Sequence, residues 1–422
     1  MKPLRVILIA AALLLAVVVF YEPILNALFL PEFVKENDRA SLEWSSADQR
    51  SELELLPAGS LTRVSASING VDGFTFLLDT GAGTTMLVGS PKLDRLNLTK
   101  QGTFDIGGTG GGVAPVADIA QNVDLTFGSV TIADMSPLVV GWEELPFFVD
   151  AESIFFDGVI GYDLFQRVRA EVDFGAGTVV LRPPGPRGTD MAPDVDLTLI
   201  RRGRDVYTTI EVQAKQDSGR AEGQFHVDTG SNGVTLIAEN VPGVELPTDG
   251  PTRPAIGVQG ADGAAPITLF RLFLDDDEVV GPLRASLQRA TSADAAMGSH
   301  GRVGGNVFSR YRHVIDYSAG LLWLYRTDRS DAPYSLGFTG LAAFPSREGF
   351  RVVRVDEASP AADAGLTPGD TIVAVAGRQA TQLDMDAWVN TVSELAPGES
   401  VELCVQTQSE PNCFQLAAQA LP

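Results

Sequence analysis

The hydrophobic pattern of the chain is mostly that of short β-strands. From Leu61 the sequence reads LTRVSASINGVDGFTFLLD, a strand-like stretch interrupted by Asn69 and Gly70. These two residue types tolerate the positive φ of a hairpin turn. Val, Thr and Ile recur in similar short runs elsewhere, among 43 glycines and 25 prolines. The pattern predicts a mainly β protein rather than a helical bundle.

The N-terminus differs from the rest of the chain. Lys2 and Arg5 precede an uncharged apolar run from Val6 to Tyr21, and apolar residues resume from Ile24 to Leu30. The run is slightly short of the roughly 20 residues that span a bilayer, and no small-x-small cleavage site follows it. We expect residues 1–30 to form an uncleaved transmembrane helix; a cleaved signal peptide is the alternative.

Positive charge before an apolar run keeps that end in the cytoplasm. The rest of the chain is therefore expected outside it, anchored to the inner membrane and facing the periplasm or an equivalent extracytoplasmic space.

Breaks in composition divide the remainder. Residues 31–57 are polar with few apolar positions and suggest a stalk. A Pro/Gly-rich stretch at 183–188 and a polar stretch at 327–333 are typical of linkers. The predicted folded units are residues 58–186, 187–328 and 335–420.

Size and charge narrow the possible functions. A chain of 422 residues is too long for one hydrophobic core. Its net charge of −23 would repel phosphate backbones, so nucleic acid is not an expected partner. The three histidines, His226, His300 and His313, have spacings that build no metal site, and we expect neither metal nor cofactor.

The first two folded units repeat each other. FLLDTGAG at Phe76 matches FHVDTGSN at Phe225. Near the end of each unit, GVIGYDLF from Gly158 aligns without a gap with GRVGGNVF from Gly301. These matches indicate a tandem duplication.

A glycine-rich stretch follows each aspartate of the repeat by about 27 residues. Each stretch could form a mobile hairpin over a site. The candidate flap residues are Gly107, Gly108 and Gly110 in the first unit and Gly257 and Gly260 in the second.

The repeated triplet carries chemistry. Asp79 and Asp228 each begin an Asp-Thr-Gly triplet after an apolar strand, and a pseudo-twofold arrangement would bring both carboxylates to one axis. Two carboxylates in one site repel, so a single proton is held between them. The ionised one can then take a proton from water while the protonated one donates to a peptide carbonyl. The supporting residues are Gly81 and Gly230, which allow the sharp turns, and Thr80 and Thr229, which can hydrogen-bond across the axis.

From Ala58 to Tyr325 the sequence resembles the aspartic proteases of the pepsin and retropepsin type, on LLDTGA, HVDTGS, GVIGYDLF and GRVGGNVF. The resemblance implies two β lobes, and two flaps would make the chain more similar to a fused retropepsin dimer. It also implies that the apolar-apolar-Gly segments support the active-site loops: Val159, Ile160 and Gly161, and Val303 and Gly304. Arg302 departs from that pattern by replacing an apolar residue, which we expect to weaken the second support slightly.

The two triplets differ in the next residue, Ala82 or Ser231. If the Ser231 hydroxyl donates to Asp228, it favours the ionised form of that carboxylate and leaves the shared proton on Asp79. His226, on the strand before Asp228, is expected to face away from the site. The acidic run from Asp275 to Glu278 is expected at the surface.

The third unit resembles a bacterial PDZ domain, on SLGF from Ser335 and on FRVVRVDEASPAADAGLTPGDTIVAVAGRQA. The resemblance implies that Leu336, Gly337 and Phe338 capture a peptide's terminal carboxylate, with the peptide added as a strand. Ser359 as cap and Pro360 after it predict a short helix.

A second helix is predicted where apolar residues recur at helical spacing. They are Met385, Trp388, Val389 and Val392. Its apolar face would flank the peptide groove or serve only as core.

Both cysteines lie in VELCVQTQSEPNCFQL, two strand-like runs around a turn. Cys404 and Cys413 are therefore candidates for a hairpin disulfide in a compartment that allows oxidation. Two buried reduced cysteines are the alternative.

The leading hypothesis is an anchored aspartic endopeptidase that recruits polypeptides through its PDZ domain. The alternative is a non-catalytic envelope module that binds peptides with a degenerate protease fold. A purely structural envelope protein would leave the paired triplets unexplained. The relative placement of the two carboxylates separates these readings.

Overall fold

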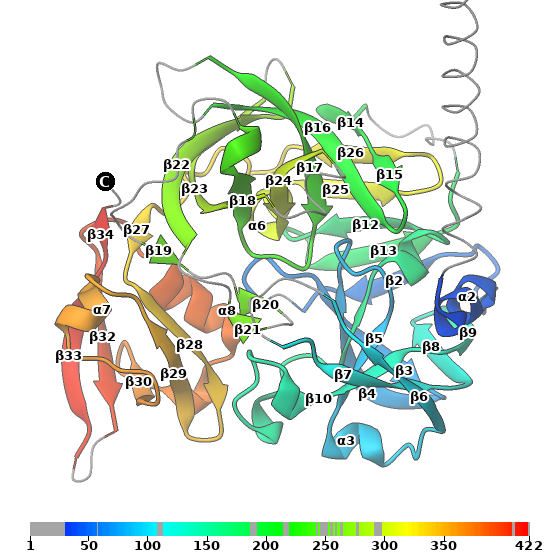
Figure 1. The fold of residues 1–422 in the computed structure, drawn as a ribbon, viewed down its shortest axis with the longest axis horizontal. Coiled ribbons are helices and arrows are strands. Elements are labelled where there is room, and N and C mark those ends of the chain that lie inside the picture. Colours follow the sequence, from blue (N-terminus) through cyan, green and yellow to red (C-terminus); the bar gives the residue numbers. More distant parts are fainter. Residues whose placement is uncertain are drawn as a thin grey trace, which may run out of the picture.

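The computed structural model describes most of the chain after residue 29 (Figure 1). The described residues are 30–56, 58–107, 113–185, 192–213, 219–241, 244, 252–253, 256–257, 260–261, 265–275, 278–290, 298–406 and 410–420. Within these ranges no helix is long and apolar enough to cross a membrane. The predicted transmembrane helix lies outside the described residues, except for Leu30.

The prediction of a mainly β chain is confirmed. Lobe 1 is built on one large sheet whose strands alternate buried and exposed side chains. In pairing order the strands are β1 (Ser41–Trp44), β9 (Val130–Met135), β8 (Val123–Phe127), β3 (Arg63–Ile68), β4 (Val71–Leu78), β11 (Gly158–Ile160), β5 (Met86–Gly89), β10 (Leu138–Gly141), β7 (Val116–Ala120) and β6 (Lys100–Asp105).

Lobe 2 repeats this plan in a second sheet. Its strands pair in the order β15 (Ile200–Arg202), β16 (Asp205–Gln213), β17 (Ala221–Asp228), β24 (Ser299–Gly304), β18 (Val234–Ile237), β23 (Val279–Gln288), β22 (Ala265–Phe273) and β19 (Thr252–Arg253). A short hairpin of β20 (Ile256–Gly257) and β21 (Gly260–Ala261) belongs to the same lobe.

A third sheet joins the lobes. It contains β14 (Val195–Thr198), β26 (Leu321–Tyr325), β25 (Arg312–Asp316), β12 (Arg169–Asp173), β13 (Thr178–Arg182) and β2 (Ser51–Glu54), in that order. Lobe 1 contributes β12 and lobe 2 contributes β25, which pair antiparallel with Val172 opposite His313. A single buried apolar cluster runs through both lobes, from Val64 and Phe76 to Phe225 and Leu324. The lobes therefore share one core.

The helices of the two lobes are short. They are α2 (Glu32–Arg39), α3 (Pro91–Asp94), η1 (Trp142–Glu144), η2 (Ala151–Ser153), α4 (Tyr162–Phe165), η3 (Ala238–Asn240) and α6 (Gly305–Phe308). In Figure 1, lobe 2 lies above lobe 1, and strands β12 and β13 of the shared sheet lie between them.

The expectation of a stalk over residues 31–57 is wrong. Helix α2 buries Phe33 and Val34, strand β1 pairs with β9 in lobe 1, and strand β2 pairs with β13 in the shared sheet. The segment looked like a stalk because β1 and β2 lie at sheet edges, where half of the side chains face water and little apolar periodicity remains.

The C-terminal domain combines a main sheet and a short two-stranded sheet with several short helices. Its elements are β27 (Gly337–Phe338), β28 (Leu341–Ser346), β29 (Gly349–Val355), α7 (Pro360–Asp363), β30 (Thr371–Val375), β31 (Arg378–Gln379), η4 (Ala380–Gln382), α8 (Met385–Trp388), η5 (Val389–Ser393), β32 (Ser400–Val405), β33 (Asn412–Ala417) and β34 (Gln419–Ala420). Helix α7 begins as predicted, with the Ser359 side chain accepting the Ala362 N–H and Pro360 in the first turn.

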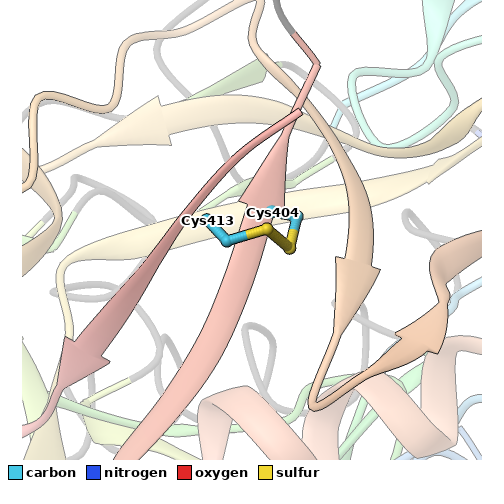
Figure 2. The surroundings of a disulfide bond; sticks show 2 residues. All are labelled: Cys404 and Cys413. Atoms are coloured by element: carbon cyan, nitrogen blue, oxygen red, sulfur yellow. A yellow bond between two sulfur atoms is a disulfide. The ribbon is translucent and has the colours of Figure 1, made fainter. Parts of the chain in front are cut away.

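Strands β32 and β33 are cross-linked near the end of the chain. Cys404 and Cys413 lie directly opposite each other in the antiparallel register, with Cα atoms 4.0 Å apart. Figure 2 shows the disulfide that joins them. It closes the hairpin that the two strand-like runs predicted.

The C-terminal domain contacts both lobes. In lobe 1, the Gly59 N–H donates to Asp386 Oδ1 over 3.0 Å, and Asp150 Oδ2 accepts the Arg347 N–H. In lobe 2, Arg284 Nη1 donates to the Gly337 carbonyl over 2.6 Å. The domain is therefore packed against the lobes rather than tethered away from them, as Figure 1 also shows.

Candidate active site

Each Asp-Thr-Gly triplet follows a strand from the middle of its lobe. Asp79 comes directly after β4, and Asp228 ends β17. Strand β11 pairs in parallel with β4, and β24 pairs in parallel with β17 in the equivalent register, with Ile160 opposite Leu78 and Val303 opposite Val227. The duplication seen in the sequence is thus a duplication of strand pairing, and it places both triplets between the lobes.

The two threonines hold the loops together. The Thr80 hydroxyl donates to the Val227 carbonyl over 2.7 Å and accepts the Thr229 N–H over 3.0 Å. The Thr229 hydroxyl donates to the Leu78 carbonyl over 2.8 Å and accepts the Thr80 N–H. Both side chains are buried. The hydrogen bonds across the axis that the sequence suggested are present, in reciprocal form.

The glycines of the triplets leave room for the opposite carboxyl. A Cβ on Gly81 would stand 2.6 Å from Asp228 Oδ1, and one on Gly230 would overlap the carboxyl of Asp79. Each glycine N–H also donates to the aspartate of its own loop, over 2.7 Å to Asp79 and 3.0 Å to Asp228. No larger residue fits at either glycine, because the backbone of each loop packs directly on the aspartate carboxyl of the other loop.

Gly161 and Gly304 back the two loops from behind. A side chain on Gly161 would overlap the carbonyls of Asp79 and Ala82, and one on Gly304 would overlap the carbonyl of Gly233. The residue after each glycine donates its N–H into the loop, Tyr162 to Ala82 and Gly305 to Ser231. Val159, Ile160 and Val303 are buried beside these contacts.

The two carboxyl groups meet. Asp79 is hydrogen-bonded to Asp228. Burial raises the pKa of Asp79 well above its usual range, and the neighbouring charge and hydrogen bond of Asp228 raise it further. The Gly81 N–H and the Arg302 guanidinium oppose that rise only in part. Asp79 therefore holds a proton at pH values where an ordinary aspartate is ionised, as a shared-proton pair requires.

Arg302 has a position that the sequence did not predict. Its Nε lies 3.0 Å from Asp228 Oδ2, as an ion pair whose N–H is not aligned for a hydrogen bond. We expected Arg302 only to weaken the support of the second loop. The sequence did contain a sign of this contact: Arg302 aligns with Val159, which is apolar. A charged residue at such a position next to an active-site loop needs a partner of opposite charge nearby.

The expected role of Ser231 is wrong. Its hydroxyl accepts the Gly233 N–H over 3.3 Å and lies 3.4 Å from the Gly233 carbonyl, within its own turn. The short loop bends the side chain back onto its own backbone instead of toward Asp228. Ser231 supports the second loop through its backbone, because its carbonyl accepts the Gly305 N–H over 2.7 Å.

His226 lies on β17 with its Nε2 3.9 Å from Asp205 Oδ1 and its ring 5.2 Å from that of Tyr207. Its position therefore does not give it a part in the Asp79–Asp228 pair.

Three of the five flap candidates lie in or next to hairpins that the structure describes. In lobe 1, Gly107 follows β6 of the β6–β7 hairpin, and a side chain there would have open space around it. Gly108 and Gly110 lie outside the described residues. In lobe 2, Gly257 and Gly260 pair with each other across the β20–β21 hairpin. That these hairpins act as flaps over a bound substrate stays a prediction.

The predicted peptide-binding loop of the C-terminal domain is held at both ends. Ser335 Oγ donates to the Leu395 carbonyl, and Gly337 and Phe338 pair with β34. A side chain on Gly337 would overlap the Leu395 carbonyl, so glycine is required there for steric reasons. Leu336 lies between these anchored residues. Of the predicted second helix, Trp388 and Val392 are core, whereas Met385 and Val389 reach lobe 1.

Comparison with known families agrees with this description. Residues 64–164 match the model of an aspartyl protease family, and residues 351–407 match that of a PDZ domain. The chain thus carries an aspartyl protease domain and a C-terminal PDZ domain. The first match ends within lobe 1, so Asp228 and the second triplet lie beyond it. A search of curated proteins found no match to the chain.

Proposed function

We propose that the protein is an aspartic endopeptidase with Asp79 and Asp228 as its catalytic pair. The observation that carries the proposal is the reciprocal packing of the two Asp-Thr-Gly loops, in which each glycine faces the other loop's carboxyl. A binding module would have no need to bury two carboxyl groups against each other, because that arrangement costs free energy unless a proton is shared.

The proposed peptide hydrolysis uses one ionised and one protonated carboxyl group. An ionised Asp228 takes a proton from a water molecule as the water oxygen attacks the peptide carbonyl carbon. Asp79, whose raised pKa keeps it protonated, donates to the carbonyl oxygen. As the tetrahedral intermediate collapses, Asp228 passes the proton it took from water to the amide nitrogen, one hydroxyl of the intermediate returns a proton to Asp79, and the C–N bond breaks. One water is consumed, and no cofactor takes part.

The substrates we propose are exported polypeptides. The PDZ domain would bind a peptide or protein C-terminus at Leu336, Gly337 and Phe338 and bring it to the lobes on which the domain packs. The apolar N-terminus would anchor the chain in the inner membrane, with both domains on the extracytoplasmic side.

Incubation of the purified full chain with a denatured protein mixture at mildly acidic pH tests the proposal. New peptide termini identified by mass spectrometry should accumulate and persist with chelators and with serine or thiol reagents. A statine-type transition-state mimic should stop their appearance. A mock preparation lacking the chain is the control. Absence of cleavage across pH 3 to 7, or cleavage abolished by a chelator, would contradict the proposal.

A further inference from the structure

Arg302 stands at a position that is apolar in the other lobe. In lobe 1, Val159 is opposite Leu77 on one neighbouring strand and Met86 on the other, and all three are buried in one apolar cluster. In lobe 2, the same register places Arg302 opposite His226 and Thr235. Three positions that are apolar beside the Asp79 loop are therefore polar beside the Asp228 loop.

The guanidinium is directed to one carboxylate. Arg302 Nε lies 3.0 Å from Asp228 Oδ2, and the side chains are 29% and 10% exposed. Among the described residues, this is the ion pair formed by Arg302. At this depth a charged pair is screened much less than at the surface. The Arg302 charge therefore acts most directly on the Asp228 carboxyl, and it lowers the pKa of Asp79 by less than burial and Asp228 raise it.

Other titratable groups around Asp228 do not supply such a charge. On β16, the Asp205 carboxyl lies 3.9 Å from His226 Nε2. The Tyr317 hydroxyl donates to the Thr80 carbonyl, and burial, with the nearby carboxylates, raises the pKa of Tyr317 well above its usual range, so it stays neutral.

Two further elements complete these surroundings. On β24, His300 accepts the Gln224 N–H, four residues before Asp228 on β17. Strand β18 carries no titratable side chain. Arg204 also reaches the first loop, where it donates to the Gly83 carbonyl, but its charge is paired with Asp38 and Asp163. Among the described residues, Arg302 is therefore the cation paired with a carboxyl of the dyad.

We propose that Arg302 is a positioning residue that keeps the negative charge of the dyad on Asp228 and so fixes Asp79 as the acid. This inference rests on the proposed proteolytic function for its kinetic consequence, but the charge distribution itself can be measured without turnover. Arg302 takes over the role that the sequence suggested for Ser231.

The sign of the pH effect follows from the charge. The lower limb of the rate profile reports the first ionisation of the dyad, which creates the charge beside Arg302. A positive charge favours that ionisation, so loss of Arg302 should move the lower limb to higher pH, by about one unit at partial exposure. The upper limb reports ionisation of the more distant Asp79 and should rise by less. The active pH range should therefore narrow.

The experiment compares pH profiles of kcat/KM for the wild type, Arg302→Met, Arg302→Lys and Arg289→Met. Arg289 lies in the same lobe with an 80% exposed side chain, and its substitution removes the same charge far from the dyad. Arg302→Met should raise the lower limb by about one unit. Arg302→Lys keeps the positive charge, so its lower limb should lie close to that of the wild type. Arg289→Met should leave both limbs in place.

A parallel titration separates this inference from the proposed function. Carboxyl carbon-13 shifts in aspartate-labelled full chain, assigned with Asp79→Asn and Asp228→Asn, follow the dyad even if no substrate is cleaved. A higher first ionisation in Arg302→Met supports the inference. Superimposable titrations of wild type and Arg302→Met overturn it, with or without catalysis. A rate that rises at every pH without a shift of the limb also overturns it, because Arg302 would then only obstruct the site.

Discussion

Thr80 and Thr229 accept each other's backbone N–H groups, both over 3.0 Å, and each hydroxyl also donates to the strand that leads into the other's loop. The dyad therefore depends on four hydrogen bonds between residues about 150 positions apart in the chain. Neither lobe can form them alone, so the placement of the Asp79–Asp228 pair and the lobe interface are one structural feature.

Thr80→Val should remove the hydroxyl with little change in volume. It leaves the Val227 carbonyl and the Thr229 N–H buried without this partner, at roughly 1 to 3 kcal/mol for each unpaired group. We expect a lower free energy of unfolding in urea and a large loss of kcat. Thr80→Ser, which keeps the hydroxyl, is the matched control and should be close to wild type in both. A valine variant with normal kcat would show that these bonds are not needed.

His313 should make the protein less stable in acid. It is buried in the shared sheet, and its Nδ1 faces the carbonyls of Phe308 and Tyr311, so this nitrogen carries the proton of the neutral ring. Burial lowers the pKa of His313 to about 4. In the unfolded chain His313 binds a proton below about pH 6.5. The neutral, buried His313 therefore makes its full contribution to the free energy of unfolding above that pH. This contribution is lost as pH falls toward 4, by up to about 3 kcal/mol.

His313→Asn keeps a donor near Nδ1 but does not titrate. Urea unfolding at several pH values between 7 and 4, in an Asp79→Asn background that prevents self-digestion, should show a flatter dependence in this variant. His300→Asn, at a half-exposed position, is the control. Equal flattening in both variants would argue against a specific role for His313.

The disulfide should stabilise the PDZ domain. Cys404 and Cys413 are nine positions apart, so the closed loop is short and the chain-entropy contribution is about 2 to 3 kcal/mol. Replacing both by alanine should lower the free energy of unfolding of this domain by that amount. A reductant should lower it similarly in the wild type and leave the double variant unchanged. Two thiols that react freely in the native, non-reduced protein would contradict the disulfide.

The sequence predicted best the features that are present in both copies of the tandem repeat. The duplication located both triplets, because each copy carries the same strand, turn and supporting glycine at the same spacing. The turn residues Asn69 and Gly70 both have positive φ, as the hairpin requires. Local patterns of this kind are determined by neighbouring residues and can be read directly.

The features that the sequence did not predict depend on distant partners. Glu278 belongs to an acidic run expected at the surface, yet it is buried and bound by Tyr311 and Arg326. Arg302 reaches Asp228 only because β24 lies beside β17. In both cases a charged residue looks solvated in the sequence and finds its counter-charge or donor through strand pairing.

If Asp79 and Asp228 act as one catalytic pair, as proposed above, neither can be replaced alone. The kcat/KM values of Asp79→Asn and Asp228→Asn measure this. Asp196→Asn, at an exposed position on β14, is the matched control, and circular dichroism verifies that each variant is folded. We predict that either dyad variant loses about 10³-fold or more, because each carboxyl has a separate proton-transfer role, while the control keeps wild-type activity. Substantial turnover by either folded dyad variant would contradict the account.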